Sequence, residues 1–598
     1  MELVPFLCYT FIRMRSYDNE LFVNKGAIYK LKSIIRSAAL AFVILFASAG
    51  IGFHSYADAV QNVQTEITRP TEHVKWNSCQ IEGKNIVIKG AMDGQLTPSD
   101  TAVGADTNFY LLELAPYEDS IANHRNIAYI SKSKDLTFKI PLNSGRKDDR
   151  LYNKFVVCVW TGETYVVVSD MIYVTNPEVV AANQTEYKTP LSKKGLLIEI
   201  SQISDAFQLG VHNVIVNIPF DAILGTGIDY TYDGETYHFD KSVVEAYDKT
   251  ISMFSNKSMN VSAILLNRFT DKAPELFYPG QNKLANVFYY NFNAKTEDGY
   301  KYIKAIASFL ADRYGGTNSD HGRIQNWIIG NEINNQRWNY VGPMKLSDYI
   351  KEYERSFRVF YNAIRSSQAN ARVFFSLDNN WNQGNDNKMT YTAKSVLSGV
   401  AYSIAAHGNI DWGLAYHPYC VPTVEPEFWD DFATGQVDWS ENSKVVNFAN
   451  LSTLTDYMQK PAMLDTNGKV RHIILSEQGF TSKSNSRGDV EKLQAAAFAY
   501  AYYIVDSNPY IDEFILSRQI DAPSEVKSGL AFGLWTTKST EDVNIVPDQR
   551  KYIWQVFKNI DKQKTTLQYS GFAKDILGIK NWSDVIPNFK WRRQELHG

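Results

Sequence analysis

The sequence predicts an α/β protein: a (β/α)8 barrel, or TIM barrel, preceded by an N-terminal β-sandwich domain. Short β-type runs separated by turn residues fill the region from about residue 70 to 180. From residue 195 onward, apolar runs alternate with amphipathic helical segments, a pattern typical of a parallel sheet covered by helices. The chain has 598 residues, too many for a single hydrophobic core, so we expect more than one domain.

The composition is that of a folded globular protein. Hydrophobic residues make up 44% of the chain and charged residues 21%, and the formal net charge is −4. Because this charge gives no electrostatic footprint for nucleic acid, we expect no nucleic-acid partner. The 36 Tyr, 32 Phe and 12 Trp suit stacking on sugar faces, although most of these rings are expected in the core.

The first 59 residues have the pattern of a leader and signal peptide. The uncharged apolar run 37–53 follows several basic residues, and Ala57-Asp58-Ala59 then matches a small-residue cleavage pattern. We therefore expect cleavage near Ala59 and a secreted or cell-surface location in a bacterium. The alternative is an uncleaved anchor, which would be the only membrane contact, although the run is slightly short for a membrane span. Residues 1–24 precede this signal, and Met14 is a candidate for the true start.

The region 60–180 is predicted to form the β-sandwich. Cys79 and Cys158 fall in this region, and the sequence fits either a disulfide between them or two isolated buried thiols. A polar stretch with Pro177 and Pro190 is predicted to lead into the next domain. The β-type runs of the sandwich lie at 85–89, 108–114, 136–140, 155–160 and 165–168.

The region 181–598 is predicted to be the barrel with a C-terminal helical extension. Most strand candidates are near-continuous apolar runs, as expected for parallel strands that are buried on both faces. The eighth strand is ambiguous between 513–517 and 530–535. The other seven candidates lie at 196–200, 213–218, 261–266, 324–330, 372–377, 412–416 and 472–476. Amphipathic helices are predicted at 241–254, 302–314, 348–364 and 493–504.

Two alternatives remain open within this region. An open, doubly wound sheet is the alternative fold, but no glycine-rich phosphate loop follows the first strand. Residues 229–239 are predicted to form a β-hairpin around Asp233-Gly234. Because the hairpin follows the second strand, it either rises over the catalytic face as a wall of the substrate site or is a plain surface hairpin.

Two glutamates end buried strands at positions that packing does not explain. Glu332 closes the sequence NWIIGNE, and Glu477 closes HIILSE. Burying a carboxylate without a partner is costly, and the carboxyl ends of TIM-barrel strands carry the catalytic groups of such enzymes. In strand order, Glu332 and Glu477 follow the fourth and the seventh strand. The alternative is that both belong to structural ion pairs.

These positions resemble those of clan A retaining glycoside hydrolases. Asn331-Glu332 after the fourth strand, Glu477 after the seventh and a histidine after the sixth match that clan's pattern over roughly residues 195–540. The resemblance implies that Glu332 is the acid/base, that Glu477 is the nucleophile and that Asn331 donates to the sugar 2-hydroxyl. Retention of configuration requires carboxyl groups about 5–5.5 Å apart. The mature chain resembles a poorly characterised bacterial family of this clan with a β domain ahead of the barrel.

Other substrate-binding residues are expected around this pair. The resemblance implies hydrogen-bonding roles for His417 and Tyr419 after the sixth strand, and a sugar platform at Trp535 after the eighth. Clan members commonly carry an arginine after the second strand, which this chain lacks, and Arg268 or Arg518 could replace it.

Trp381 offers one more ring near the site. It ends the sequence DNNW after the fifth strand, which suits sugar binding but equally fits an ordinary polar loop. Since Trp381 follows a run of polar side chains, we include it among the candidate substrate-binding residues.

The function predicted from the sequence is a secreted retaining glycoside hydrolase that acts on an oligo- or polysaccharide without a metal or cofactor. No zinc-ligand spacing, nucleophile elbow or Walker loop is present in the sequence. A transglycosidase using the same site is a close alternative. A catalytically inactive carbohydrate-binding cell-surface protein and a structural wall protein are alternatives from other classes. The sugar, its linkage and the oligomeric state are not predicted.

Overall fold

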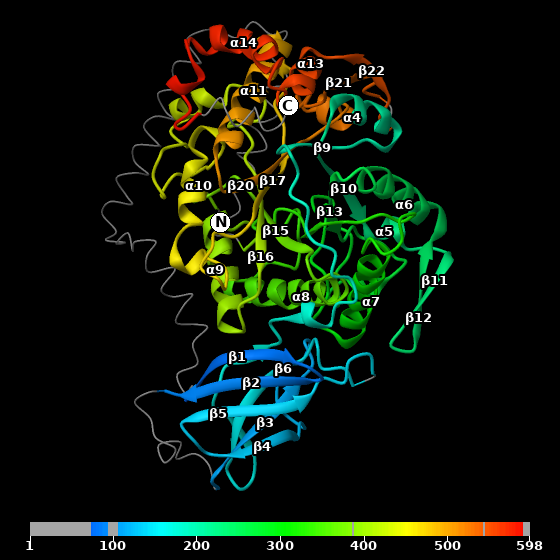
Figure 1. Ribbon diagram of the computed structural model, residues 1–598, viewed down its shortest axis with the longest axis vertical. Coiled ribbons are helices and arrows are strands. Elements are labelled where there is room, and N and C mark those ends of the chain that lie inside the picture. The colour runs from blue at the N-terminus through cyan, green and yellow to red at the C-terminus, as the bar shows by residue number, and fades with distance from the viewer. Residues whose placement is uncertain (1–72, 94–105, 147, 385–387, 542–543, 590–598) are drawn as a thin grey trace, which may run out of the picture. The chain divides into compact units, whose positions relative to one another are not determined.

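The computed structural model describes residues 73–93, 106–146, 148–384, 388–541 and 544–589 (Figure 1). Within these residues, eight parallel strands pair in the order β10-β13-β14-β15-β16-β17-β20-β9. Strand β9 also pairs with β10, so the sheet closes into a barrel. The strands are β9 (Lys194–Leu197), β10 (Asn213–Pro219), β13 (Asn260–Leu266), β14 (Asn326–Ile329), β15 (Arg372–Asp378), β16 (Trp412–His417), β17 (Ile473–Gln478) and β20 (Ile511–Leu516). The predicted (β/α)8 barrel is therefore confirmed.

The apolar runs form these strands because both of their faces are covered. Every residue of β13 is buried, and β16 is buried along its whole length. Inward-facing side chains from seven of the strands fill the barrel as one cluster: Ile215, Ile264, Leu266, Ile328, Phe374, Ala415, Ile474 and Ile515. The eighth strand is β20, which settles the ambiguity in the sequence in favour of the earlier of the two runs.

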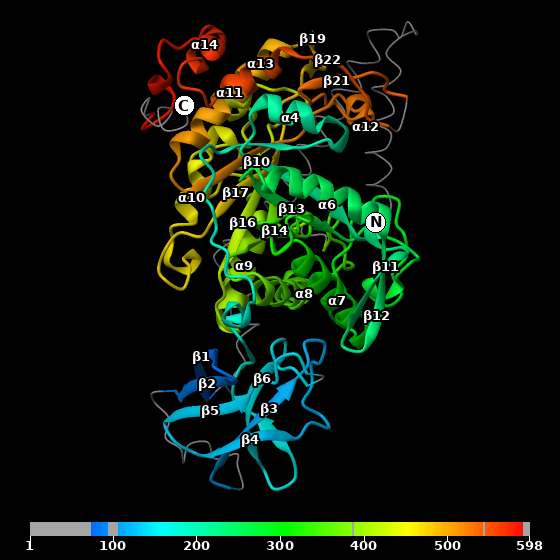
Figure 2. The same ribbon diagram turned by 45° about the vertical axis from the view of Figure 1, so that its right-hand side comes forward.

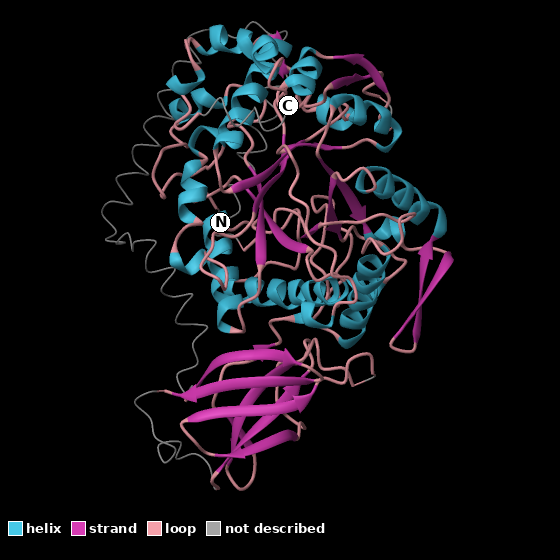
Figure 3. Cartoon of the chain, viewed as in Figure 1, coloured by secondary structure: helices cyan, strands magenta, loops and turns pink. Residues whose placement is uncertain are grey.

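Helices surround the barrel strands (Figures 2 and 3). The four predicted helices are present, and two of them start at side-chain caps: Asp240 accepts from the Val243 amide and Thr296 from the Gly299 amide. The helices are α4 (Ile203–Leu209), α5 (Phe220–Ile223), α6 (Lys241–Ser255), α7 (Glu297–Arg313), α8 (Leu346–Ser367), α9 (Ala393–Ala406), α10 (Ser452–Tyr457), α11 (Glu491–Ser507), α12 (Pro523–Lys527), α13 (Tyr552–Asn559) and α14 (Thr566–Leu577).

The predicted hairpin is present as β11 (Gly227–Tyr232) and β12 (Glu235–Asp240). Asp233 and Gly234 both have positive φ, as a two-residue hairpin turn requires. The hairpin lies against α7, because Phe239 stacks on Phe309 and the Asp233 carboxylate pairs with Lys304 (Figure 1). The structure therefore favours the surface hairpin over the substrate-wall interpretation.

The N-terminal region forms the predicted β-sandwich from two antiparallel sheets. One sheet has the order β1-β2-β5 and the other β4-β3-β6-β7, with β8 pairing with β6. Cys79 and Cys158 are buried thiols in separate apolar clusters, so the disulfide alternative is wrong. The strands are β1 (Val74–Glu82), β2 (Asn85–Met92), β3 (Asn108–Leu114), β4 (Asn126–Ser131), β5 (Asp135–Pro141), β6 (Lys154–Trp160), β7 (Tyr165–Val167) and β8 (Ile172–Tyr173).

Small two-stranded sheets complete the fold: β18 (Lys483–Ser484) with β19 (Gly488–Asp489), and β21 (Trp535–Thr537) with β22 (Pro547–Arg550). The predicted leader, its cleavage site and Met14 lie outside the described residues. Across the residues that the structure describes, no helix has the length and apolarity needed to cross a membrane.

A buried ion pair joins the first barrel strand to the C-terminal segment. The Lys194 ammonium lies 2.6 Å from Asp561 Oδ1, and the two side chains are 0% and 3% exposed. Lys194 also donates to the Leu209 carbonyl oxygen at 3.0 Å. Because both charges are removed from water, each depends on the other for compensation.

We expect Asp561→Ala to lower the free energy of unfolding by about 3–5 kcal/mol, because it leaves the Lys194 charge buried without its counterion. The double variant Lys194→Met/Asp561→Leu should recover most of this loss. Urea unfolding of the two variants measures both effects. Asp575→Ala, an exposed aspartate on α14, is the matched control. Equal destabilisation by Asp561→Ala and Asp575→Ala would contradict the role of the pair.

Candidate active site

An unusual backbone turn connects the end of strand β14 to Glu332. Gly330 has φ +79° and Glu332 itself has φ +40°, in the left-handed region that non-glycine residues rarely adopt. The turn is held by hydrogen bonds: the Glu332 amide donates to Ser376 Oγ at 2.7 Å, and the Asn335 amide donates to the Glu332 carbonyl oxygen at 2.8 Å. Strain of this kind, fixed by its surroundings, is typical of functional sites.

His417, the last residue of β16, connects Glu332 to the strand that carries Glu477. Its Nδ1 lies 2.9 Å from Glu332 Oε1, and its Nε2 lies 2.9 Å from Ser476 Oγ. The imidazole is fully buried, whereas the Glu332 side chain is 13% exposed. Both ring nitrogens are therefore engaged, which fixes the orientation of the ring.

The protonation of this group departs from ordinary values. Burial raises the pKa of Glu332 to about 7, although the hydrogen bond from His417 opposes the rise, and the charges of Asp378 and Glu477 add to it. Burial disfavours the charged form of His417, but its hydrogen bond to Glu332 and the surrounding negative charges outweigh this and raise its pKa. Burial therefore favours the protonated carboxyl group of Glu332, and the negative charges around His417 favour the protonated imidazole.

Glu477 accepts a hydrogen bond from the loop that follows β16. The Tyr419 hydroxyl donates to Glu477 Oε1 at 2.8 Å, and Asn379 Nδ2 donates to the Tyr419 carbonyl oxygen at 2.6 Å. Burial and the charge of Glu477 raise the pKa of Tyr419 well above its usual value, so the phenol stays protonated as a donor. Two of the residues expected from the sequence thus form hydrogen bonds with the two glutamates: His417 with Glu332, and Tyr419 with Glu477.

Asp378 is a site residue that the sequence analysis treated only as part of a polar loop. It ends β15 directly opposite His417 in the strand register. Asn334 Nδ2 donates to Asp378 Oδ1 at 2.6 Å and Asn380 Nδ2 to Asp378 Oδ2 at 2.7 Å, and burial raises the pKa of Asp378. The signal in the sequence was its position as an acidic residue at the end of the fifth apolar run.

Asn331 and Arg268 lie at neighbouring strand ends. Asn331 directly precedes Glu332 and is 7% exposed. Arg268 follows β13 and pairs with Asp221 at 2.7 Å, while its side chain is 55% exposed. That ion pair raises the pKa of Arg268. Arg268 is therefore open to solvent, with one carboxylate already bound.

The two predicted tryptophan platforms are wrong. Trp381 is fully buried, with Nε1 donating to the Glu441 carbonyl oxygen and its ring packed edge-on against Tyr457. Trp535 does not end the eighth barrel strand, because it starts β21 and donates to Asp205 Oδ2 at 2.9 Å. Trp381 is therefore closed to a ligand, and the half-buried Trp535 ring lies against the Arg550 guanidinium.

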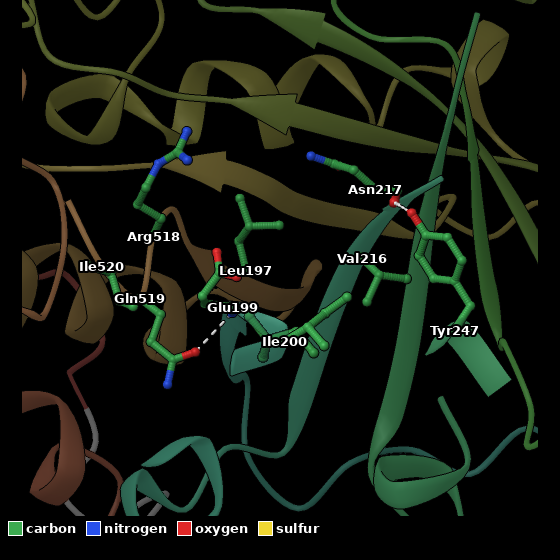
Figure 4. A pocket seen from close by; sticks show the side chains of 10 residues that line it. Leu197, Glu199, Ile200, Val216, Asn217, Tyr247, Arg518, Gln519 and Ile520 are labelled. Atoms are coloured by element: carbon green, nitrogen blue, oxygen red, sulfur yellow. Dashed lines mark hydrogen bonds between the residues drawn. The ribbon is translucent and has the colours of Figure 1, made fainter. Parts of the chain in front are cut away.

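A cavity of about 200 Å³ opens at the carboxyl ends of β9, β10 and β20. Figure 4 shows Arg518, Gln519 and Ile520 on one side of it and Val216, Asn217 and Tyr247 on the other. This volume is below the range of about 300–1,000 Å³ that is typical of sites for drug-sized ligands. The remaining lining residues are Leu197, Ile198, Glu199 and Ile200.

The cavity lies beside the strand that carries Glu477, because β17 pairs with β20. The Ser517 amide donates to the Gln478 carbonyl oxygen at 2.8 Å, which places Arg518 next to the end of β17. Arg518 pairs with Glu525, and burial raises the pKa of Glu525 with a contribution from the charge of Glu477. Among the described residues, no group of three or more His, Cys, Asp or Glu side chains is placed to hold a metal ion.

Comparison with known proteins gives a family and several similar solved structures. The sequence model of DUF5722, a family of unknown function, matches residues 186–585. No curated protein matches the chain.

The similar solved structures include three glycosidases that share little sequence identity with this chain. A family 39 glycoside hydrolase from the gut symbiont Bacteroides cellulosilyticus WH2 is 14% identical over 77% of this chain and 78% of that chain, with a TM-score of 0.40. A β-D-glucuronidase of Dictyoglomus thermophilum is 12% identical over 82% and 68%, with a TM-score of 0.33. A family 1 β-glucosidase from Thermotoga maritima is 11% identical over 62% and 86%, with a TM-score of 0.37. At these scores the likeness carries no conclusion about activity.

We expect Glu332→Gln to stabilise the protein at pH 8 but not at pH 5. The raised pKa of Glu332 means that the protonated form contributes its stability below pH 4.5, and this is lost as pH rises through about 7. A neutral glutamine avoids the loss, which amounts to roughly 1–3 kcal/mol. Urea unfolding at the two pH values measures the difference. The control is Glu245→Gln on the exposed face of α6; a stability gain for Glu332→Gln that is equal at both pH values would refute the assignment.

Proposed function

The chain belongs to DUF5722, a family of unknown function, and we propose that it is a glycoside hydrolase in which Glu332 is the proton donor and Glu477 the nucleophile. One observation carries the proposal: two glutamates at the rim of one barrel stand in opposite chemical environments. Glu332 is buried against His417 with a raised pKa, whereas Glu477 accepts a hydrogen bond from Tyr419. Glycoside cleavage needs one carboxyl group that donates a proton and a second that forms a bond to the sugar.

Glu332 supplies the proton. A pKa of about 7 leaves a large fraction of the carboxyl group protonated at neutral pH, and it is the property expected of a general acid. In the first step, the proton moves from Glu332 to the glycosidic oxygen as the bond to the anomeric carbon breaks. His417 holds the carboxyl group in place through Oε1.

Glu477 forms the new bond. Its carboxylate attacks the anomeric carbon from the opposite face and gives a glycosyl-enzyme ester, while Tyr419 donates to the same carboxyl group. In the second step, Glu332 removes a proton from water, which attacks the anomeric carbon and releases Glu477. The product then has the configuration of the substrate. Asn331, beside Glu332, donates to the sugar 2-hydroxyl in this proposal.

The sequence of residues 1–59 supports the further proposal that the enzyme acts outside the cytoplasm. N-terminal sequencing of the protein recovered from its producing cells tests this. A new N-terminus near residue 60 is the expected result, and an intact leader on the mature protein speaks for the anchor alternative.

We expect wild-type protein to hydrolyse at least one member of a panel of α- and β-aryl glycosides, and Glu477→Ala to lower kcat at least about 10³-fold, because no covalent intermediate can form. The first-formed sugar anomer, followed by NMR, should retain the substrate configuration. Inversion would remove the nucleophile role. Glycan binding without turnover would favour the carbohydrate-binding alternative, and sugar transfer in preference to hydrolysis would favour the transglycosidase.

We expect Glu332→Gln to slow substrates with poor leaving groups about 10²–10⁴-fold while activated aryl glycosides are slowed far less, because only the former need the acid. In wild type, the rate on poor leaving groups should fall as pH rises through about 7, since the acid loses its proton there. Glu332→Gln should lack this alkaline limb. An unchanged limb in the variant would assign it to another group.

We expect Tyr419→Phe to lower kcat roughly 10- to 100-fold, since a hydrogen bond to a charged group contributes about 1.5–3 kcal/mol. The ring remains in place against Phe532, so folding should be unaffected. Kinetics on an activated aryl glycoside measure the change, and circular dichroism checks the fold. A variant as active as wild type would show that the Tyr419 hydroxyl does not support Glu477.

A further inference from the structure

Three aromatic side chains form a continuous row beside the two glutamates. Phe288 stacks face to face on Trp338, with ring centroids 4.4 Å apart and planes 15° from parallel. Trp338 in turn contacts Tyr289 at 6.1 Å between centroids. We call these three residues the aromatic shelf. The Phe288 side chain is 52% exposed, so the shelf keeps an apolar ring face open to solvent.

The shelf is built from two loops at the rim of the barrel, one after β13 and the other after β14. Backbone hydrogen bonds join these loops: the Phe288 amide donates to the Arg337 carbonyl oxygen at 2.7 Å, and the Tyr340 amide donates to the Tyr289 carbonyl oxygen at 3.0 Å. The exposed ring is therefore held on a fixed support, which lowers the entropy cost of binding a ligand to it.

The inner end of the shelf reaches the proposed catalytic pair. Tyr289 packs against the cluster of side chains that fills the barrel. Burial and the charge of Glu477 raise the pKa of the Tyr289 phenol. Trp338, the middle ring of the shelf, follows Glu332 in the chain: the Asn335 amide donates to the Glu332 carbonyl oxygen, and the Trp338 amide donates to the Asn335 carbonyl oxygen.

The two sides of the site differ in shape. The cavity lies at the ends of β20, β9 and β10, next to the strand that carries Glu477. The aromatic shelf lies on the loops after β13 and β14, on the side of Glu332. A sugar bonded to Glu477 occupies the side of the nucleophile, and the group that receives the proton from Glu332 departs on the other.

We propose that the aromatic shelf binds sugar rings of the leaving group, so that the substrate is an oligo- or polysaccharide rather than a glycoside of a small alcohol. The proposal rests on the proposed function. The apolar face of a pyranose stacks on an aromatic ring through its C–H groups, and the open face of Phe288 offers such a surface. The exposed Arg337 and Asn286 side chains beside the shelf provide polar partners for hydroxyl groups.

The test compares substrates that differ only in the leaving group. Wild type and Phe288→Ala are assayed first on α- and β-fluorides of glucose, galactose, mannose, xylose and glucuronic acid, because fluoride has no ring to occupy the shelf. They are then assayed on oligosaccharides, two to five units long, of the sugar that is turned over. We expect Phe288→Ala to leave kcat/KM on the fluoride within twofold of wild type and to lower it about tenfold on the longer oligosaccharides.

Two further variants separate stacking from general damage. Phe288→Tyr keeps a flat ring and should restore oligosaccharide turnover. Tyr129→Ala removes a ring that is more exposed than Phe288, 66% against 52%, on β4 of the β-sandwich, and should change neither substrate class. Melting temperatures confirm that each variant is folded.

The outcomes distinguish this proposal from the function on which it rests. Turnover of a fluoride with equal effects of Phe288→Ala on all substrates overturns the shelf and leaves the hydrolase intact. Turnover of fluorides without any turnover of oligosaccharides overturns it as well. If wild type turns over no member of either set, the proposed function fails, and the aromatic-shelf proposal, which depends on it, fails as well.

Discussion

Closure of the parallel barrel is the constraint on which the whole site depends. Since all eight strands run in one direction, their carboxyl ends form a single rim, and side chains that follow different strands meet there regardless of their separation in the chain. Four consecutive strands, β14 to β17, carry or lead into the polar group: Asp378 and His417 end β15 and β16, Glu477 is the second-last residue of β17, and Glu332 lies three residues after β14. The register of β15 on β16 sets Asp378 opposite His417. The geometry of the polar group is thus a property of strand pairing rather than of the loops.

Burial changes the proton affinities of these side chains. Three carboxyl groups and one imidazole share a space with little water, and they cannot all be ionised without a large desolvation cost. Burial therefore raises the pKa of Glu332, whereas burial alone would lower the pKa of His417, which is raised by its hydrogen bond to Glu332 and by the negative charges around it. The Tyr419 hydroxyl, which stays protonated, donates to Glu477 and compensates its charge. Two residues of the same type have different neighbours, and the proposed division into an acid and a nucleophile depends on that difference.

The barrel was predictable because each of its strands is a short apolar run, and burial on both faces demands such runs. The glutamates, His417 and Tyr419 could be found because they directly follow those runs. The tryptophans could not be assigned, since a ring beside polar residues has the same local sequence whether it faces solvent or, like Trp381, the interior. The aromatic shelf was also missed. Its residues lie in long loops without periodicity, and only the pairing of the two loops brings Phe288 onto Trp338.

The backbone turn at Glu332 connects the proposed proton donor to the aromatic shelf. A non-glycine residue with φ +40° costs roughly 1–3 kcal/mol, and glycine would fit the same turn at less cost. The fold alone does not require a carboxyl group there, so the strained glutamate supports a chemical role. The turn also orients the chain that follows. The Asn335 amide donates to the Glu332 carbonyl oxygen, and the Trp338 amide donates to the Asn335 carbonyl oxygen. One turn therefore positions both Glu332 and Trp338, the ring on which Phe288 stacks, so a change that relaxes the turn displaces both together.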